Sequence, residues 1–141
     1  MTLEEIEAEL DALESARPAA DKATRLLALG ERVLEIWVEA QGAEPTAQET
    51  EGFRLLALHR QGCKGVPSFN ACRETARELV YHCNLVNLDP DHNDADQRAE
   101  MMRMVAMHLF LFVSGKMQVE GLGDFCCASK PIRTNGAATA P

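Results

Sequence analysis

The sequence lacks a Cys-x-x-Cys pair, and its five cysteines are an odd number. A disulfide framework is not needed, because a chain of 141 residues is long enough to bury a hydrophobic core. The N-terminus, MTLEEIEAEL, has neither the basic nor the apolar region of a secretory signal. Together these absences predict a cytoplasmic protein with reduced thiols.

Basic residues are also scarce in this chain. It has 22 Asp and Glu against 14 Lys and Arg, for a net charge of −8, and its basic residues form no cluster. Because such a surface repels a phosphate backbone, we expect no nucleic-acid partner. An acidic surface instead suits another protein that has a basic surface.

Long hydrophobic runs are missing as well. The longest nearly uninterrupted one, residues 104–113, contains His108 and has about half of the roughly 20 residues that a membrane span needs. We therefore expect no membrane contact and interpret this run as part of a buried helix. The chain also has no internal repeat and no strand pattern longer than a few residues, so we predict an all-α fold.

Hydrophobic periodicity and capping motifs predict a bundle of about five helices in a single domain, residues 1–130, followed by a flexible C-terminal tail, residues 131–141. The first expected helix begins at the capping box Thr2–Glu5, and the second runs from Pro18 to about residue 41. The third begins at a second capping box, Thr46–Glu49, and ends at Gly62. The fourth and fifth cover about 68–87 and 94–117.

Two of these helices carry more apolar surface than one layer of neighbours covers. Apolar residues take up more than half of the circumference of the second helix, and the last helix is apolar on every side between residues 104 and 113. We therefore expect the last helix to lie in the centre of the bundle or at a subunit interface, and the protein to be a homodimer. The predicted interaction residues are Leu10, Trp37, Met101, Met104, Met107 and Phe110.

The chain shows no local motif for nucleophilic catalysis, such as Gly-x-Ser-x-Gly. We predict no catalytic residue and no cofactor. The favoured function is that of a non-catalytic regulatory protein, of the adaptor or anti-activator type, that binds another protein.

The alternative function is a metal or thiol sensor built from residues 59–83, which hold three of the five cysteines and two of the four histidines. His59 and Cys63 have the i, i+4 spacing of two ligands on one helical face, although we expect Gly62 to end the helix between them. With His82 they are the predicted metal ligands, for zinc or copper. The sensor hypothesis also includes Cys72 and Cys83.

Cys72 and Cys83 share one face of the expected fourth helix, with 3-4 spacing of apolar residues around them. They are eleven residues, or about 16 Å, apart along the axis, so they cannot join one zinc site. We expect both to pack as small hydrophobic side chains.

Two other groups of sulfur-containing residues allow more than one interpretation. Met101, Met104 and His108 share one side of the last helix, which permits a Cu(I) site. Packing or a protein interface explains the methionines without a metal, and we expect His108 in the core. Cys126 and Cys127 are adjacent in a predicted loop, where an accessible thiolate permits a redox role.

Overall fold

The computed structural model describes residues 1–13, 17–63 and 70–121 and confirms the all-α bundle. In these ranges there are five helices and no strand, apart from one isolated bridge between Thr50 and Phe53. The helices are α1 (Leu3–Ala12), α2 (Ala19–Ala40), α3 (Arg54–Cys63), α4 (Asn70–Leu88) and α5 (Ala95–Val119).

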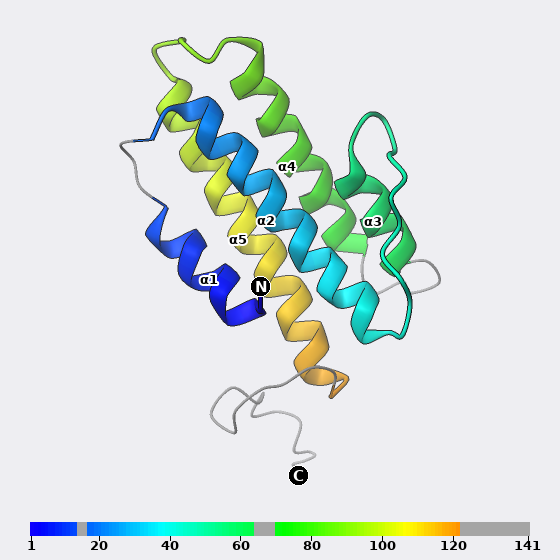
Figure 1. Cartoon of the computed structure of the whole chain (residues 1–141). Helices are drawn as coiled ribbons and strands as arrows, with labels where there is room; N and C mark the ends of the chain where they lie inside the picture. Colours follow the sequence, from blue (N-terminus) through cyan, green and yellow to red (C-terminus); the bar gives the residue numbers. More distant parts are fainter. Residues whose placement is uncertain (14–16, 64–69, 122–141) are drawn as a thin grey trace.

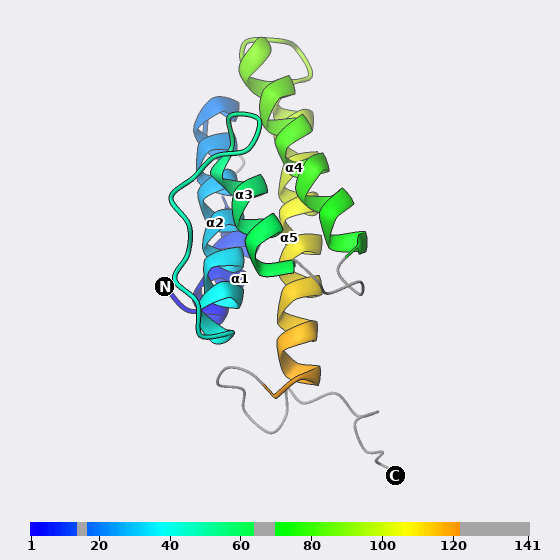
Figure 2. The same cartoon turned by 90° about the vertical axis from the view of Figure 1, so that its right-hand side faces the viewer.

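Three long helices, α2, α4 and α5, run side by side and form the centre of the bundle (Figures 1 and 2). The two short helices cover its sides: α1 packs against α2 and α5, and α3 packs against α2 and α4. The helix α5 contacts α1, α2 and α4. It therefore lies in the centre of the bundle on one side only, and the subunit interface that the sequence analysis gave as the alternative stays a prediction.

The first helix begins as its sequence predicts. The Thr2 hydroxyl accepts a hydrogen bond from the backbone N–H of Glu5 at 3.2 Å, and the Glu5 carboxylate accepts one from the backbone N–H of Thr2 at 2.7 Å. This reciprocal pair is a complete capping box. On the inner side of α1, Ile6 and Leu10 are fully buried against α2 and α5.

The wide apolar arc of α2 is covered within the single chain. This helix contacts all four other helices, and the side chains of Leu26, Val33, Leu34 and Trp37 are fully buried. The apolar surface of α2 thus needs no second chain to cover it, and it no longer supports the homodimer.

The connection between α2 and α3 differs from the prediction. The motif Thr46–Glu49 does not begin a helix, and α3 starts only at Arg54. The Thr46 hydroxyl accepts from the backbone N–H of Gln48 at 3.1 Å, which is a local turn contact and not an N-cap.

A tight turn explains why no helix can continue through this connection. Glu51 and Gly52 both have positive φ angles, 54° and 84°, which are left-handed conformations outside a right-handed helix. Thr50 and Phe53, on either side of them, exchange two backbone hydrogen bonds of 3.0 Å. The second predicted capping box was therefore wrong, because its four residues do not determine the backbone conformation of the residues that follow.

The helix α3 also continues further than predicted, through Gly62 to Cys63. A Cβ at Gly62 would lie 2.6 Å from Cδ1 of Trp37, so only glycine lets the indole ring lie this close to the helix. The indole Nε1–H donates a hydrogen bond of 2.7 Å to the Gly62 carbonyl. This contact fixes the end of α3 against α2.

The last two helices have bounds within a few residues of the prediction. On α4, the predicted apolar positions Cys72, Ala76, Leu79, Cys83 and Val86 are all buried. The predicted tail, residues 131–141, lies outside the described residues, and the domain boundary stays a prediction. Within the described ranges, no helix combines the length and the hydropathy that a membrane span requires.

Candidate functional site

The most extended candidate site is the side of α5 that faces away from the bundle. Met101, Met104, Leu111 and Phe112 are large apolar side chains, yet 46%, 48%, 53% and 46% of their surface is exposed. The full set, which we call the outer face of α5, consists of Met101, Met104, His108, Leu111, Phe112, Gly115 and Val119.

The outer face of α5 is a straight, uncharged stripe. At 100° per residue its members fall within an arc of about 100°, and α5, which is described in full, has no charged residue in that arc between positions 101 and 119. Met101, Met104, His108, Leu111 and Gly115 follow one another at the 3-4 spacing of a coiled-coil seam. The stripe is about 27 Å long, at a rise of 1.5 Å per residue.

The predicted interaction residues separate into two groups. Met101 and Met104 lie on the outer face of α5, and Met107 is half-buried at its edge. Leu10, Trp37 and Phe110, in contrast, are at most 4% exposed and belong to the core of the chain, where they are not accessible to a partner.

His108 was misplaced by the sequence analysis, which expected it in the core. It is exposed, on the same side of α5 as Met101 and Met104. Leu111, Phe112 and Val119 were not singled out at all. A helix that is apolar on every side has no periodicity to show which side faces inward, but the row of small residues Ala95, Ala99 and Ala106, all buried, indicates the packed side.

A second candidate site joins the end of α3 to the start of α4. Among the described residues, the ligand atoms of His59, Cys63 and Cys72 form one group in which every pair lies within 4.8 Å. His59 and Cys63 come from one face of α3, because that helix continues through Gly62. Cys72 is in the first turn of α4. Sequence spacing therefore identified two members of this group but not the third.

The two cysteines of this group have opposite electrostatic environments. Hydrogen bonding from the Cys72 thiol, with a smaller effect of His59, lowers the pKa of Cys63 to about 6, although burial acts in the other direction. The same hydrogen bond and burial raise the pKa of Cys72. The pair therefore favours ionisation of the Cys63 thiol over ionisation of the Cys72 thiol.

His59 is the most constrained member of the group. Its side chain is buried, with 6% of the residue exposed. Among the residues that the structure describes, none gives the buried Nε2 atom a hydrogen-bond partner. A buried polar atom without a partner is rare, because its desolvation costs about 1–3 kcal/mol.

The other residues of the sensor hypothesis lie elsewhere. His82 is ten residues beyond Cys72 on α4, about 15 Å along the axis, and its ring contacts Tyr81 edge-on at 5.3 Å between centroids. The thiol of Cys83 accepts a hydrogen bond from Asn87 at 3.5 Å, and burial raises its pKa. Cys126 and Cys127 lie outside the described residues.

The carboxylates of Glu31 and Glu35 on α2 both contact Arg54, and Glu35 is also paired with Arg32 at 3.1 Å. Arg54 contacts Glu31 at 3.5 Å and forms a closer ion pair with Glu35, and its Nε–H donates to the Thr46 carbonyl at 2.8 Å. The arginine connects the start of α3 to α2. These acids are therefore part of the fold's ion pairs and not an open cation site.

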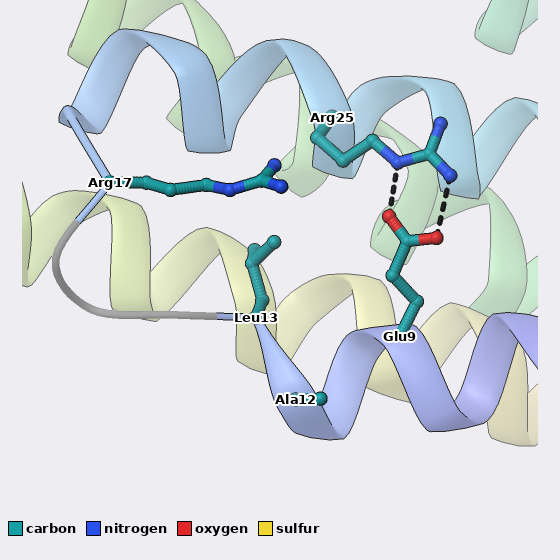
Figure 3. Close-up of a pocket in the computed structure, with 5 residues that line it drawn as sticks. All are labelled: Glu9, Ala12, Leu13, Arg17 and Arg25. Carbon is teal, nitrogen blue, oxygen red and sulfur yellow. Dashed lines mark hydrogen bonds and ion pairs between the residues drawn. The ribbon is translucent and has the colours of Figure 1, made fainter.

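A hollow between α1 and the start of α2 is lined by Glu9, Ala12, Leu13, Arg17 and Arg25 (Figure 3). Figure 3 shows that both oxygens of the Glu9 carboxylate face the guanidinium of Arg25, which donates two hydrogen bonds to them. Since Glu9 already compensates the charge of Arg25, only the exposed Arg17 offers a charge to an anion. This hollow is not a built anion site.

Comparisons with known proteins add no assignment, since no protein-family model, curated protein or solved structure matches this chain. Its function has to be inferred from its own residues.

Proposed function

We propose that this chain is a non-catalytic regulatory protein that acts as a homodimer, in which the outer face of α5 packs against the same face of a second copy. The observation that carries the proposal is the uncharged apolar stripe from Met101 to Val119. Exposed apolar stripes of this length on small proteins are typical of interaction surfaces.

The outer face of α5 is the surface on which two copies can meet with little charge repulsion. Each chain carries a net charge of −8, so two copies repel each other across most of their surfaces. The stripe on α5 is a long surface where this repulsion is weakest. A helix packed against its own copy also forms a closed, two-fold symmetric interface, which is the commonest arrangement of soluble dimers.

The residue types of the stripe suit helix packing. The 3-4 spacing of its members is that of knobs-into-holes packing, and methionine side chains adapt to irregular partner surfaces. A Cβ at Gly115 would meet nothing within 4 Å in the chain, so a second helix can approach closely there.

The acidic outer side of α1 supports the regulatory role within this proposal. The outer side of α1 exposes Glu4, Glu7 and Asp11, and two copies would present this acidic surface twice to a partner with a basic surface. The proposed setting is the cytoplasm, where the free thiols of Cys63, Cys72 and Cys83 stay reduced.

The proposal is tested by placing a charge on the stripe. Leu111→Lys buries a charge in the proposed interface, so we expect the variant to be monomeric at micromolar concentration while the wild-type chain is dimeric, as measured by sedimentation equilibrium. The matched control is Leu88→Lys, at the end of α4, where 83% of the residue is exposed and no interface is proposed. Circular dichroism checks that both variants stay folded. A monomeric wild-type chain, or equal effects of the two substitutions, would contradict the proposal.

A further inference from the structure

The cluster of His59, Cys63 and Cys72 has no part in the proposed dimer. Its residues lie on α3 and α4, and none belongs to the outer face of α5. The unpaired Nε2 atom of His59 and the close approach of two thiols need a separate explanation.

We propose that His59, Cys63 and Cys72 bind a thiophilic d¹⁰ cation, Zn²⁺ in the first place, with one coordination position left for solvent or for an exogenous ligand. Three protein ligands with one open position are the arrangement of non-structural zinc sites, and two cysteines with one histidine are among the ligand sets found there.

The distances allow this site to close around an ion. Zn–S bonds of about 2.3 Å and Zn–N bonds of about 2.0–2.1 Å place tetrahedral ligand atoms about 3.6–3.8 Å apart. The ligand atoms of the three residues already lie within 4.8 Å of one another. The difference between these two ranges is about 1 Å, so binding would require only a small approach of the ligand atoms.

The donor set selects the kind of ion. Two thiolates and one imidazole are soft or borderline ligands, which suit Zn²⁺ and Cu(I), whereas Mg²⁺ and Ca²⁺ require oxygen ligands. When Zn²⁺ binds, the Cys72 thiol releases its proton to solvent, and the charges of the two thiolates then balance the charge of the ion. A balanced site is compatible with the burial of His59 and Cys72, which are 6% and 2% exposed.

Burial of His59 is the independent observation that points to a ligand. Within the part of the chain that the structure describes, two buried ring nitrogens have no hydrogen-bond partner, Nε2 of His59 and Nδ1 of His82. Of these two histidines, His59 is the one that lies beside two thiols, where a bound cation would occupy a ring nitrogen that packing alone leaves unpaired. Access is available on the other side of the group, because Cys63 is only half-buried.

The position of the cluster gives metal binding a structural consequence. Cys63 is the last residue of α3, and Cys72 lies in the first turn of α4, so a shared ion ties these two helices together. Gly62, next to Cys63, accepts the hydrogen bond of Trp37, the only tryptophan of the chain. We therefore expect metal binding to raise the melting temperature and to change the tryptophan fluorescence.

The test is equilibrium dialysis of the reduced, metal-free full chain against Zn²⁺ and, in a separate arm, against Cu(I), with metal analysis and tryptophan fluorescence. We expect one equivalent of Zn²⁺ per chain. His59→Gln, Cys63→Ser and Cys72→Ala should each lower the affinity at least tenfold. If only Cu(I) binds, and the three substitutions lower the affinity for Cu(I) in the same way, the proposed site is confirmed with Cu(I) as its ion.

The controls use the same residue types outside the cluster. His82→Gln, Cys83→Ala and the double variant Cys126→Ser/Cys127→Ser should all keep one equivalent of metal. Loss of binding in any of these, or the absence of stoichiometric binding of both ions to the wild-type chain, would overturn the proposal.

A measurement on the wild-type chain avoids variants that fail to fold. In the metal-free chain, iodoacetamide should label the half-buried Cys63 before the buried Cys72 and Cys83, as read by peptide mass spectrometry, and one equivalent of Zn²⁺ should slow the labelling of Cys63 at least tenfold. Labelling of Cys63 that is unchanged by the ion would also overturn the site. Neither readout depends on the subunit count, so failure of the metal site and failure of the dimer are distinguishable.

Discussion

Two cysteines on one face of α4 have different surroundings. Cys72 meets Cys63 and His59 from the end of α3, whereas the contact of Cys83 is Asn87 on its own helix. Both are buried, as the spacing of apolar residues predicts. Periodicity indicates which side of a helix is buried, but it does not say which residues of another helix lie there, so the third member of the cluster was not predictable from spacing.

Gly62 is a residue whose role depends on one neighbour. Gly62→Ala would place a Cβ against the rigid Trp37 ring, so we expect a loss of about 1–3 kcal/mol in the free energy of unfolding, measured with urea. The matched control is Gly115→Ala on α5, where a Cβ meets nothing within 4 Å in the chain. Because alanine has the higher helix propensity, Gly115→Ala should leave the free energy of unfolding unchanged or raise it by up to about 1 kcal/mol.

Because Gly115 lies on the proposed interface, both glycine variants are compared in a Leu111→Lys background, where association does not contribute. Equal effects of the two substitutions would show that the contact between Trp37 and Gly62 does not limit the space at position 62.

The ion pair of Glu9 and Arg25 predicts a pH dependence of stability. Hydrogen bonding from Arg25 lowers the pKa of Glu9 from its ordinary value of 4.5. The folded state thus holds the charged form more strongly than the unfolded state does. The contribution of the ion pair to the free energy of unfolding is fully present above about pH 4.5. This contribution is lost as the pH falls through the lowered pKa of Glu9 in the folded state.

Glu9→Gln should therefore destabilise the protein at pH 7, by about 1 kcal/mol or less because the pair is partly exposed, and this difference should vanish under acidic conditions. Thermal unfolding at several pH values measures it. Glu7→Gln, at an exposed position on the same helix, is the control. A difference between Glu9→Gln and wild type that stays constant with pH would contradict the role of the ion pair.

At the scale of elements, helix ends were predicted best where a local motif and the tertiary structure agree. Thr2 and Glu5 form the predicted capping box, and α1 follows directly. Thr46 and Glu49 match the same motif but lie just before the turn at Glu51 and Gly52. Local sequence therefore predicted α1 correctly and misplaced the start of α3.

The helix α5 shows the limit of hydrophobic patterns. A position in the centre of the bundle or at a subunit interface was predicted, but the side that faces inward was not, since residues 104–113 are apolar in every direction. Packing against α1, α2 and α4 decides which side is covered. That choice buries Phe110, leaves Leu111 and Phe112 exposed, and creates the stripe on which the proposed function depends.

At the scale of the whole molecule, the acidic charge acts against association. Two copies, each with a net charge of −8, repel each other at long range, and salt screens this repulsion over a Debye length of about 10 Å at 0.1 M. We therefore expect the dimer to become tighter as the ionic strength rises, measured as a falling dissociation constant in sedimentation equilibrium. A dimer held by ion pairs would weaken instead.

The most direct test of the central claim, that α5 packs against its own copy, is complementation between opposite charges at one position. Leu111 lies near the middle of the stripe, so a two-fold symmetric interface brings it close to the Leu111 of the second copy. We predict that Leu111→Lys and Leu111→Glu are each monomeric and that an equal mixture sediments at about twice the chain mass of 15.5 kDa. A mixture that stays monomeric, while the wild-type chain is dimeric, would contradict the proposed packing of α5.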